Sequence, residues 1–524
     1  MKEQTSAPIH GQELKSVAKG AGIAFVGRGI GAGLQYLYMI LLARFLGTER
    51  LGLYLLGLTL TNIAGVVAKL GLDKGILRFV ALYGGEADFA RMKGILLYAL
   101  RVAGSLSVLI GAGIFACATV LADFFKKPDL VPVLHIFSLS LPFYILFTLS
   151  LVAMQAIHAM KFNVALQHLF LPLCTMFMTW LFVLSGAQLW GVLAGYSLSL
   201  VVATLLAFYL LRRIFPAFTK KEMRPIYEGD TLMRYSMPLM LAMFLNFSLL
   251  WTDTLMLGYY RTSSEVGIYN LAVKTALLPN LILVAFNAIF TPIMSDLFNR
   301  GEIKKVEGLF KTVTRWIFLM SFPYTLIVAL LSKEIMGIFG LEFAVGWVSL
   351  ILLVCSQLIS AGTGPVIEIL SMSGKQMVML YNEVGAVVLN VLLNVLLIPP
   401  FGITGAAIAT GIAWATLNVM SLVQVHRRYR IHPYERACFK PLLAGLVAFC
   451  LLFQVKALLR WAHLPKLPTM FAVTGLFLVV YIGLLWRMGL SSDDHFILDK
   501  FRGRFFSRPS ASTLRSMPAS IEES

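Results

Sequence analysis

Apolar runs of about 20 residues or more alternate with short polar segments along nearly the whole chain. The hydrocarbon core of a bilayer is about 30 Å thick, so a spanning helix needs about 20 mostly apolar residues. The pattern therefore predicts an all-α polytopic membrane protein with about fourteen transmembrane helices. The expected spans are residues 17–45, 51–72, 94–121, 131–157, 163–185, 189–211, 235–259, 266–290, 316–340, 345–371, 376–398, 403–425, 441–459 and 468–487.

The composition agrees with this prediction. Of the 524 residues, 58% are hydrophobic and 13% are charged, and the mean hydropathy is +0.81. Soluble domains carry about 25% charged residues, so one water-soluble core could not bury this chain. The net charge of +18 lies in short segments between apolar runs, which is typical of loops beside anionic lipid and not of a nucleic-acid-binding protein. The five cysteines have no metal-ligand spacing, and we expect no metal, no cofactor and no catalytic residues.

The distribution of basic residues predicts the orientation. With the N-terminus inside, about 31 of the 44 Lys and Arg residues fall on the inner side and about nine on the outer side. The positive-inside rule then places both termini in the cytoplasm. Residues 1–16 lack the apolar core and cleavage site of a signal peptide, so the first span is expected to be retained. All outer loops are short, which opposes a membrane glycosyltransferase or polymerase with a large external catalytic loop.

Short segments recur at an offset of about 215 residues. Gly52-Leu53-Tyr54 matches Gly267-Ile268-Tyr269, and Arg212-Arg213 matches Arg427-Arg428. Each half holds six spans and enters from the same side, so the repeat is parallel, with a pseudo-twofold axis along the membrane normal. The expected organisation is a cytoplasmic N-terminal segment (1–16), an N-lobe (17–213), a basic cytoplasmic linker (214–234), a C-lobe (235–428), a cytoplasmic loop (429–440), two appended spans (441–487) and a partly disordered cytoplasmic tail (488–524).

Ionisable and amide side chains inside the apolar runs are the candidate functional residues. A charged side chain at mid-bilayer costs about 2.5–3.5 kcal/mol on insertion scales, so it normally faces a protein interior or a wet cavity. Helical spacing places several of these side chains on common stripes, as with Arg28 and Gln35 or Asn270 and Lys274. The candidates for lining a cationic cavity are Arg28, Gln35, Asn62, Lys69, Arg101, Asn270 and Lys274.

Structural roles are alternatives for these cations. Lys69 lies near the inner end of its span, where snorkelling to the headgroups explains it as well as a cavity does. Arg28 could instead pack against or cap a neighbouring helix, and a structural role explains Arg101 equally well.

Three carboxylates are candidates for ion coupling. Asp253 should lie at a similar depth to Lys274, so a structural ion pair between them is an alternative to a cavity role for the lysine. The same pair could couple transport by exchanging protons or sodium. Glu368 and Glu383 are further candidates, although placement at the inner interface is the simpler interpretation.

Three segments together resemble the polysaccharide-exporter (O-antigen-type flippase) family of the multidrug/oligosaccharidyl-lipid/polysaccharide exporter superfamily. Residues 42–54 (LARFLGTERLGLY) resemble its first-hairpin signature, and residues 253–272 resemble its seventh-to-eighth span signature. Asn390, Asn394 and residues 398–407 are similar to its turn between spans eleven and twelve. The resemblance covers roughly residues 17–428.

The resemblance implies a two-lobed flippase, not an enzyme, that moves an undecaprenyl-diphosphate-linked oligosaccharide outward across a bacterial inner membrane. Cations in a wet groove would suit the two negative charges of a diphosphate. The implied partners are the lipid-linked substrate, membrane lipid and a polysaccharide polymerase. The alternatives are a peptidoglycan-precursor (lipid II) flippase, a cation-coupled drug exporter, a membrane glycosyltransferase or polymerase, and a scaffold that transports nothing.

Overall fold

The computed structural model describes residues 11–216, 223–435, 439–461 and 466–488, and all its regular elements there are helices. The tail expected beyond residue 488 lies outside the described residues. The elements are α1 (Gly11–Lys69), α2 (Leu72–Gly85), α3 (Phe89–Ala116), α4 (Ala118–Phe124), α5 (Leu130–Ala156), α6 (Met160–Val164), the π-helix η1 (Ala165–Phe170), α7 (Leu171–Leu184), α8 (Gln188–Ile214), α9 (Gly229–Tyr260), α10 (Ser263–Ala276), α11 (Asn280–Asn299), α12 (Ile303–Phe339), the 3-10 helix η3 (Leu341–Gly346), α13 (Trp347–Thr363), α14 (Val366–Met372), α15 (Gln376–Tyr429), α16 (Phe439–Trp461) and α17 (Lys466–Arg487).

Two of the long helices are hairpins. Helix α1 has a non-helical backbone at Gly47 (φ 69°), and α15 has one at Gly402 (φ 56°), both in the left-handed region that favours glycine. Asn390 donates to Thr410 at 3.2 Å although 20 residues separate them, whereas a straight helix would hold them about 30 Å apart. The chain therefore turns back on itself at these glycines.

These hairpins explain the number of membrane crossings. Among the described residues, ten helices are long and apolar enough to cross a membrane, and counting each of two bent pairs as one span brings the number to twelve. Because α1 and α15 each contain two arms, the structure holds about fourteen crossings, as the pattern predicts. The chain is a multi-pass membrane protein.

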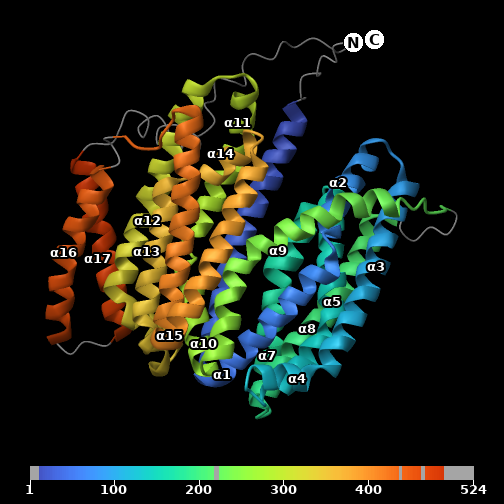
Figure 1. The fold of residues 1–524 in the computed structure, drawn as a ribbon, viewed down its shortest axis with the longest axis horizontal. Coiled ribbons are helices and arrows are strands. Elements are labelled where there is room, and N and C mark those ends of the chain that lie inside the picture. Colours follow the sequence, from blue (N-terminus) through green and yellow to red (C-terminus); the bar gives the residue numbers. More distant parts are fainter. Residues whose placement is uncertain (1–10, 217–222, 436–438, 462–465, 489–524) are drawn as a thin grey trace, which may run out of the picture.

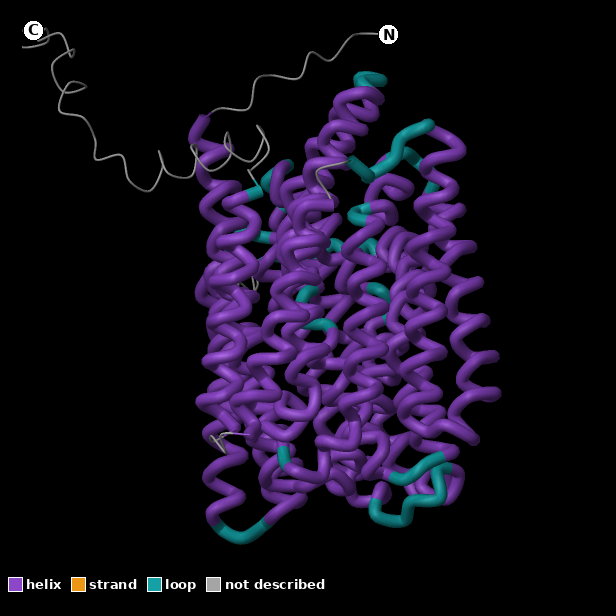
Figure 2. The backbone as a smooth tube through the Cα atoms, turned by 90° about the vertical axis from the view of Figure 1, so that its left-hand side faces the viewer, coloured by secondary structure: helices purple, strands orange, loops and turns teal. Residues whose placement is uncertain are grey.

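Several crossings are broken within the membrane body, where short non-helical segments are visible (Figure 2). Leu70 and Gly71 have positive φ between α1 and α2, and α10 and α11 meet at a bend of 43°. The spans predicted from the sequence leave residues 73–93 as an inner segment between crossings. This prediction is largely wrong, because α2 continues the second crossing through most of that segment. Residues 303–315, expected to precede a span, belong to α12.

The helices form two groups. In Figure 1, α2, α3, α5 and α8 lie to the right, α12, α13 and α15 lie to the left, and α16 and α17 occupy the left edge. We call the two groups, with the crossings that join them, the N-half and the C-half. A large apolar core runs between the halves and contains Tyr54 and Tyr269, which are equivalent positions of the repeat. The appended helices α16 and α17 pack against Leu330 and Leu331 of α12.

The two halves touch through repeat-related glycines. A Cβ atom on Gly52 would lie 1.7 Å from the carbonyl oxygen of Ser263, and one on Gly267 would lie 2.4 Å from that of Thr48. Gly52 and Gly267 are related by the offset of 215 residues, and so are Thr48 and Ser263. This reciprocal contact is what a pseudo-twofold axis produces. We call the end of the molecule near this contact the outer end, following the orientation expected from the basic residues.

Candidate functional site

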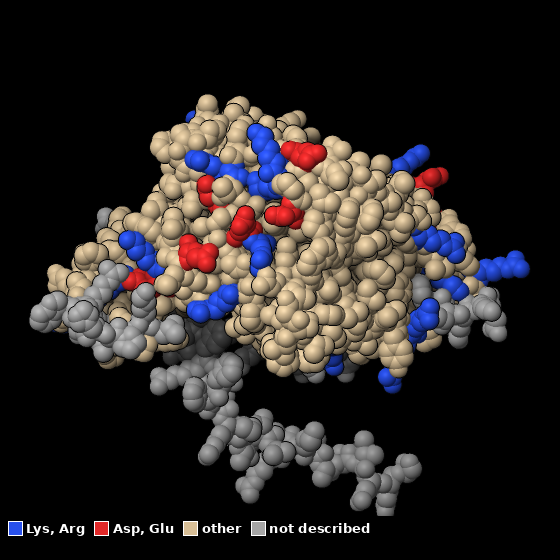
Figure 3. Space-filling model, turned by 90° about the horizontal axis from the view of Figure 1, so that it is seen from below, with Lys and Arg blue, Asp and Glu red and all other residues tan. Residues whose placement is uncertain are grey.

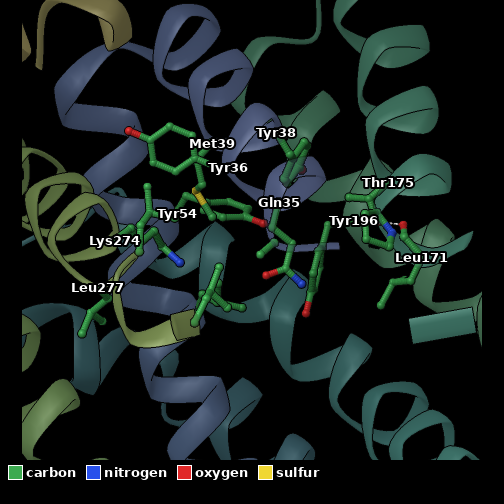
Figure 4. Close-up of a pocket in the computed structure, with 15 residues that line it drawn as sticks. Gln35, Tyr36, Tyr38, Met39, Tyr54, Leu171, Thr175, Tyr196, Lys274 and Leu277 are labelled. Carbon is green, nitrogen blue, oxygen red and sulfur yellow. Dashed lines mark hydrogen bonds between the residues drawn. The ribbon is translucent and has the colours of Figure 1, made fainter. Parts of the chain in front are cut away.

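A cavity of 380 Å³ lies between the N-half and the C-half. Both arms of α1 contribute to it, together with α7 and α8 from the N-half and the segment from α10 to α11 from the C-half. Its lining residues are Ala32, Gln35, Tyr36, Tyr38, Met39, Tyr54, Leu58, Leu171, Pro172, Thr175, Tyr196, Lys274, Leu277, Leu278 and Leu281 (Figure 4). A cavity that both halves line is the arrangement expected for transport between rocking bundles.

Lys274 and Gln35 are the two predicted site residues in this lining. In Figure 4 the Lys274 ammonium and the Gln35 amide both point into the central space. Lys274 comes in the last turn of α10, just before the crossing breaks at Leu277 and resumes at Asn280 as α11. The break therefore brings the positive end of the α11 dipole to the edge of the same cavity.

Arg28 lies two helical turns from Gln35 on the first arm of α1, toward the inner end, and its side chain is exposed. It is close enough to His168 for the two side chains to interact electrostatically. His168 belongs to the π-helix η1, and a Cβ on Gly31 would lie 2.7 Å from the His168 Cβ. Single-turn π-helices of this kind occur often at functional sites.

Aromatic side chains form much of the cavity wall. Tyr54 and Tyr196 meet edge to face, with ring centroids 6.4 Å apart. The Tyr36 hydroxyl lies 3.0 Å from the hydroxyl of Thr275, which joins the first crossing to α10. Tyr324 of α12 donates to the Thr275 carbonyl oxygen at 2.7 Å. The Tyr36 contact therefore joins the two halves next to Lys274, and the Tyr324 hydrogen bond holds α12 against α10 within the C-half.

The structure places the other five predicted cavity residues, Arg28 among them, outside this lining. Lys69 is buried and lies over the ring of Tyr144, with 5.9 Å from Nζ to the ring centroid. Arg101 is exposed and donates to the Tyr227 hydroxyl at 3.0 Å, so it holds the linker between the halves.

Asn62 is half-buried on the second arm of α1. Asn270 accepts a hydrogen bond from Thr254 at 3.2 Å and donates to the Val266 carbonyl at 2.9 Å. Its amide therefore stabilises the packing of α10 against α9.

Asp253 lies at the centre of a second polar site, inside the C-half. Its carboxylate is 2% exposed and accepts hydrogen bonds from Tyr269 at 2.6 Å, from Asn394 at 2.7 Å, from Asn390 at 3.1 Å and from Thr410. The donors come from α10 and from both arms of α15. The carbonyl oxygen of the Asn394 amide is buried and has no partner among the described atoms. A buried carboxylate beside a spare amide oxygen is an oxygen-rich ligand set of the kind that hard cations prefer.

The structure contradicts the alternative ion pair between Asp253 and Lys274. Among the described residues no salt bridge joins the two, and the four hydroxyl and amide donors occupy the Asp253 carboxylate. The prediction failed because equal depth in the membrane does not imply a shared face: Lys274 faces the cavity, and Asp253 faces the interior of the C-half.

The remaining two predicted carboxylates also lie in the C-half. Glu368 accepts a hydrogen bond from Asn287, which joins α14 to α11. Glu383 is buried near the start of α15. Neither belongs to the cavity lining.

At the outer end, cations of the N-half bind the ends of C-half helices. Arg44 donates to the Ile338 carbonyl at 2.9 Å, near the end of α12. Lys127 donates to the carbonyls of Gly258 and Arg261, the latter at 2.7 Å, at the end of α9. Burial at this contact lowers the pKa of the Lys127 ammonium. Basic and acidic side chains are interspersed over this end (Figure 3). Cations at helix C-termini are stabilising, so these contacts hold the outer end closed.

Sequence reasoning missed Tyr36, Tyr196 and Thr175 in the cavity wall, because aromatic and hydroxyl side chains are common in apolar helices and carry no distinctive signal. It also gave no site role to Asn390 and Asn394. Their i, i+4 spacing on an apolar run, with the cost of burying amides in a membrane, was a signal that could have found them.

Family models match two parts of the chain. The model described as polysaccharide biosynthesis protein matches residues 17–298, and the model described as MatE matches residues 238–396. The first of these covers slightly more than half of the 524 residues.

Curated relatives point in the same direction. The probable low-salt glycan biosynthesis flippase Agl15 of Haloferax volcanii is 30% identical over 174 residues, which is 32% of this chain and 36% of that protein. The succinoglycan biosynthesis transport protein ExoT of Rhizobium meliloti is 22% identical over 348 residues, or 66% of each chain. The matches cover only about a third of the length of Agl15 and of the probable flippase AglR of Haloferax volcanii (36% and 37%).

Solved structures share the fold. The lipid II flippase MurJ in an inward closed conformation has a TM-score of 0.68 at 13% identity, over 92% of this chain and 99% of that chain. An inward-facing multidrug resistance MATE family transporter of the MOP superfamily has a TM-score of 0.64 at 15% identity, over 76% and 94%. At these identities the likeness is one of fold.

Proposed function

The chain belongs to the polysaccharide biosynthesis protein family, and on that premise we propose that it is a flippase for an undecaprenyl-diphosphate-linked oligosaccharide. It carries this repeat unit of a cell-surface polysaccharide outward across the bacterial inner membrane, with both termini in the cytoplasm. The observation that carries the proposal is the Lys274 ammonium in a cavity that both halves line.

The charges of the cavity fit a diphosphate. Lys274 brings a mobile positive charge to the cavity. Arg28 lies two turns nearer the inner end, and its guanidinium can form bidentate hydrogen bonds with phosphate oxygens. Holding a lysine at mid-membrane costs about 2.5–3.5 kcal/mol on insertion scales, and an anionic substrate offsets that cost. The polyprenyl tail remains in the lipid while the sugar crosses between the halves.

No bond needs to be made or broken in this function. The halves touch at Gly52 and Gly267 at the outer end, so the substrate enters from the inner side in this arrangement. Export requires the outer contacts of Arg44 and Lys127 to separate, which is the alternating access expected of two rocking bundles.

Asp253 is the proposed site of the coupling cation, either H⁺ or Na⁺. Binding a cation there would change the hydrogen bonds among Tyr269, Asn394 and Thr410, and with them the packing of α9 and α10 on α15. Since α10 also carries Lys274, the same helix connects the cation site to the substrate cavity. Glu368 and Glu383 remain proposed alternatives for this role.

A peptidoglycan precursor, lipid II, also carries a polyprenyl diphosphate, so the same cations would suit it. A drug exporter for cationic compounds would instead need a carboxylate in the cavity, whereas Lys274 is the charged residue among the described lining residues. The cavity therefore favours an anionic lipid-linked substrate over a cationic drug.

The experiment replaces Lys274 and Arg28 singly with Ala in the source organism and measures surface glycan by gel. We expect surface glycan to fall by about tenfold or more in each variant, because each removes a charge-assisted contact worth about 1.5–3 kcal/mol. Lys274→Arg should retain part of the export. Lys74→Ala, which removes an exposed cation of α2, is the matched control. Normal export at normal protein level in both the Lys274 and the Arg28 variant would contradict the proposal.

A further inference from the structure

A second buried polar cluster lies in the C-half, between the Asp253 site and the inner end. The amides of Asn382 and Gln424 bond each other in both directions, with 2.6 Å and 2.9 Å between nitrogen and oxygen. Asn382 also donates to Ser421 at 3.3 Å. Asn418 accepts from Ser360 at 3.4 Å and from Thr363 at 3.3 Å. The Asp253 site and the transport cavity share none of these residues.

The two polar sites are in register on the two arms of α15. On the first arm Asn382 precedes Asn390 by eight residues, and on the second arm Thr410 precedes Asn418 by eight residues. Eight residues of α-helix rise about 12 Å, which leaves room for one layer of side chains between the sites. Burying this many amides and hydroxyls along one line within a membrane protein is costly and usually marks an ion pathway.

The layer between the two sites is apolar, and each arm of α15 contributes an alanine to it. Ala386 and Ala413 are buried there with Leu249 and Leu417, and Trp414 packs against them. The Trp414 indole N–H is buried and has no hydrogen-bond partner among the described atoms. The two alanines keep the side chains of the layer short where the arms of α15 face each other, and the indole brings this N–H donor to its side.

The inner cluster also reaches the surface. Gln424, which bonds Asn382, lines an open groove of 480 Å³ together with Arg427 on the outside of α15. Glu383 is buried beside Asn382 in the sequence. A basic side chain, Arg427, therefore lies in the groove that the inner end of this line of polar residues reaches.

We propose that the cation bound at Asp253 exchanges with the cytoplasm through the interior of the C-half, along the facing arms of α15, and not through the substrate cavity. The inference rests on the proposed coupling role of Asp253. The cluster of Asn382, Gln424 and Asn418 is the inner vestibule. The Ala386–Ala413 layer is the constriction that a hydrated cation or a chain of waters must cross, in the way that short apolar constrictions gate channels.

This separation has a consequence for coupling. Substrate in the cavity between the halves does not block cation release to the cytoplasm, because the two ligands leave by different routes. Closing the apolar layer should slow cation exchange and leave the Asp253 site itself intact.

The test measures binding and exchange, not transport. The full chain is purified and reconstituted. One assay records bound ²²Na⁺ and its dissociation rate, and a second assay records proton release after a pH jump. Ala413→Leu and Ala386→Val each narrow the layer from a different arm of α15. For the cation that the wild type binds, we expect each layer variant to keep its affinity within about threefold of wild type and to exchange the cation at least about tenfold more slowly. Val388→Leu, at an exposed position on the first arm of α15 outside both the layer and the groove, is the matched control and should exchange at the wild-type rate.

The outcomes separate the pathway from the proposed function. If both layer variants bind the cation and exchange it at the wild-type rate, the pathway is wrong, and the coupling role of Asp253 stands. If Asp253→Asn binds the cation as wild type does, or the wild type binds neither cation, the coupling role is wrong and the pathway falls with it. Slow exchange in the layer variants alone supports both.

Discussion

Replacing Gly52 with Ala should open the outer end of the protein. The new Cβ would lie 1.7 Å from the Ser263 carbonyl oxygen, half of the 3.4 Å at which ordinary contact begins. The obstacle is backbone and cannot rotate away, so the second arm of α1 and α10 must move apart. In the reciprocal contact a Cβ on Gly267 would lie only 2.4 Å from the Thr48 carbonyl oxygen, so the halves have no free space on the other side of the axis into which to shift.

The magnitude follows from the cost of overpacking. Adding a methyl group to a close-packed contact costs about 1–3 kcal/mol. The cost applies only while the outer end is closed, so the ratio of outer-closed to outer-open molecules should fall by about 5- to 150-fold. Alanine is otherwise better than glycine inside a helix by about 1 kcal/mol, so the helix itself should not be weakened.

The assay is a distance measurement by pulsed electron paramagnetic resonance between spin labels at Glu49 and Leu341, two exposed positions on opposite halves. Wild type should give mainly the short distance, and Gly52→Ala should transfer population to a longer one. Gly113→Ala is the control, because nothing lies within 4 Å of its Cβ. An unchanged distance distribution in folded Gly52→Ala protein would refute the reasoning.

Three further predictions concern stability and closure. Lys456 of α16 forms a largely buried ion pair with Glu334 of α12, with 3.0 Å between nitrogen and oxygen. Lys456→Met takes the ammonium group away from that carboxylate and should lower the free energy of unfolding by about 3 kcal/mol in thermal melts. Adding Glu334→Gln to this variant should restore part of the loss. Tyr83 of α2 donates a hydrogen bond to the Glu228 carboxylate just before α9. Tyr83→Phe should therefore lower the free energy of unfolding by about 1.5–3 kcal/mol, the value of a hydrogen bond to a charged group, and an unchanged thermal melt would show that this bond does not stabilise the fold. Lys127→Met should raise the open population in the spin-label experiment, and no change there would show that the outer end closes without this cation.

The membrane topology was largely predictable because its cause is local. Each crossing must be a run of apolar residues about 20 long, and the sequence displays those runs directly. The breaks within crossings were not predictable in the same way. Leu70 has a positive φ although nothing about leucine suggests it, since the packing of Gly71 against Ser236 of α9 decides the conformation there.

The candidate site was predictable only in part. Lys274 stands out because an ammonium in an apolar run needs an explanation. The sequence does not show whether a carboxylate or a cavity surrounds the buried ammonium group. Asp253, expected at the same depth, was a reasonable but wrong partner for it. Two donors to Asp253, Asn390 and Asn394, lie 137 and 141 positions away in the chain, and such pairings depend on how the helices pack.

The resemblance of short motifs to a known family is confirmed by the family match over residues 17–298. Those motifs lie where the fold demands special geometry. Gly47 and Gly52 of the first motif make the hairpin turn and the contact between the halves, and Gly402 of the last motif makes the other hairpin turn. Their positions are therefore set by architecture, and they carry little information about which sugar is moved.

The central claim is that a cation in the cavity between the halves moves a diphosphate-linked glycan across the membrane. The most direct measurement reconstitutes the full chain into vesicles that contain a polyprenyl-diphosphate-linked oligosaccharide and follows protection of the sugar from an external glycosidase. Wild-type protein should make the sugar of both leaflets accessible within the assay, and Lys274→Met should slow this by about tenfold or more. Equal rates for the two proteins, or no movement by the wild type, would contradict the account.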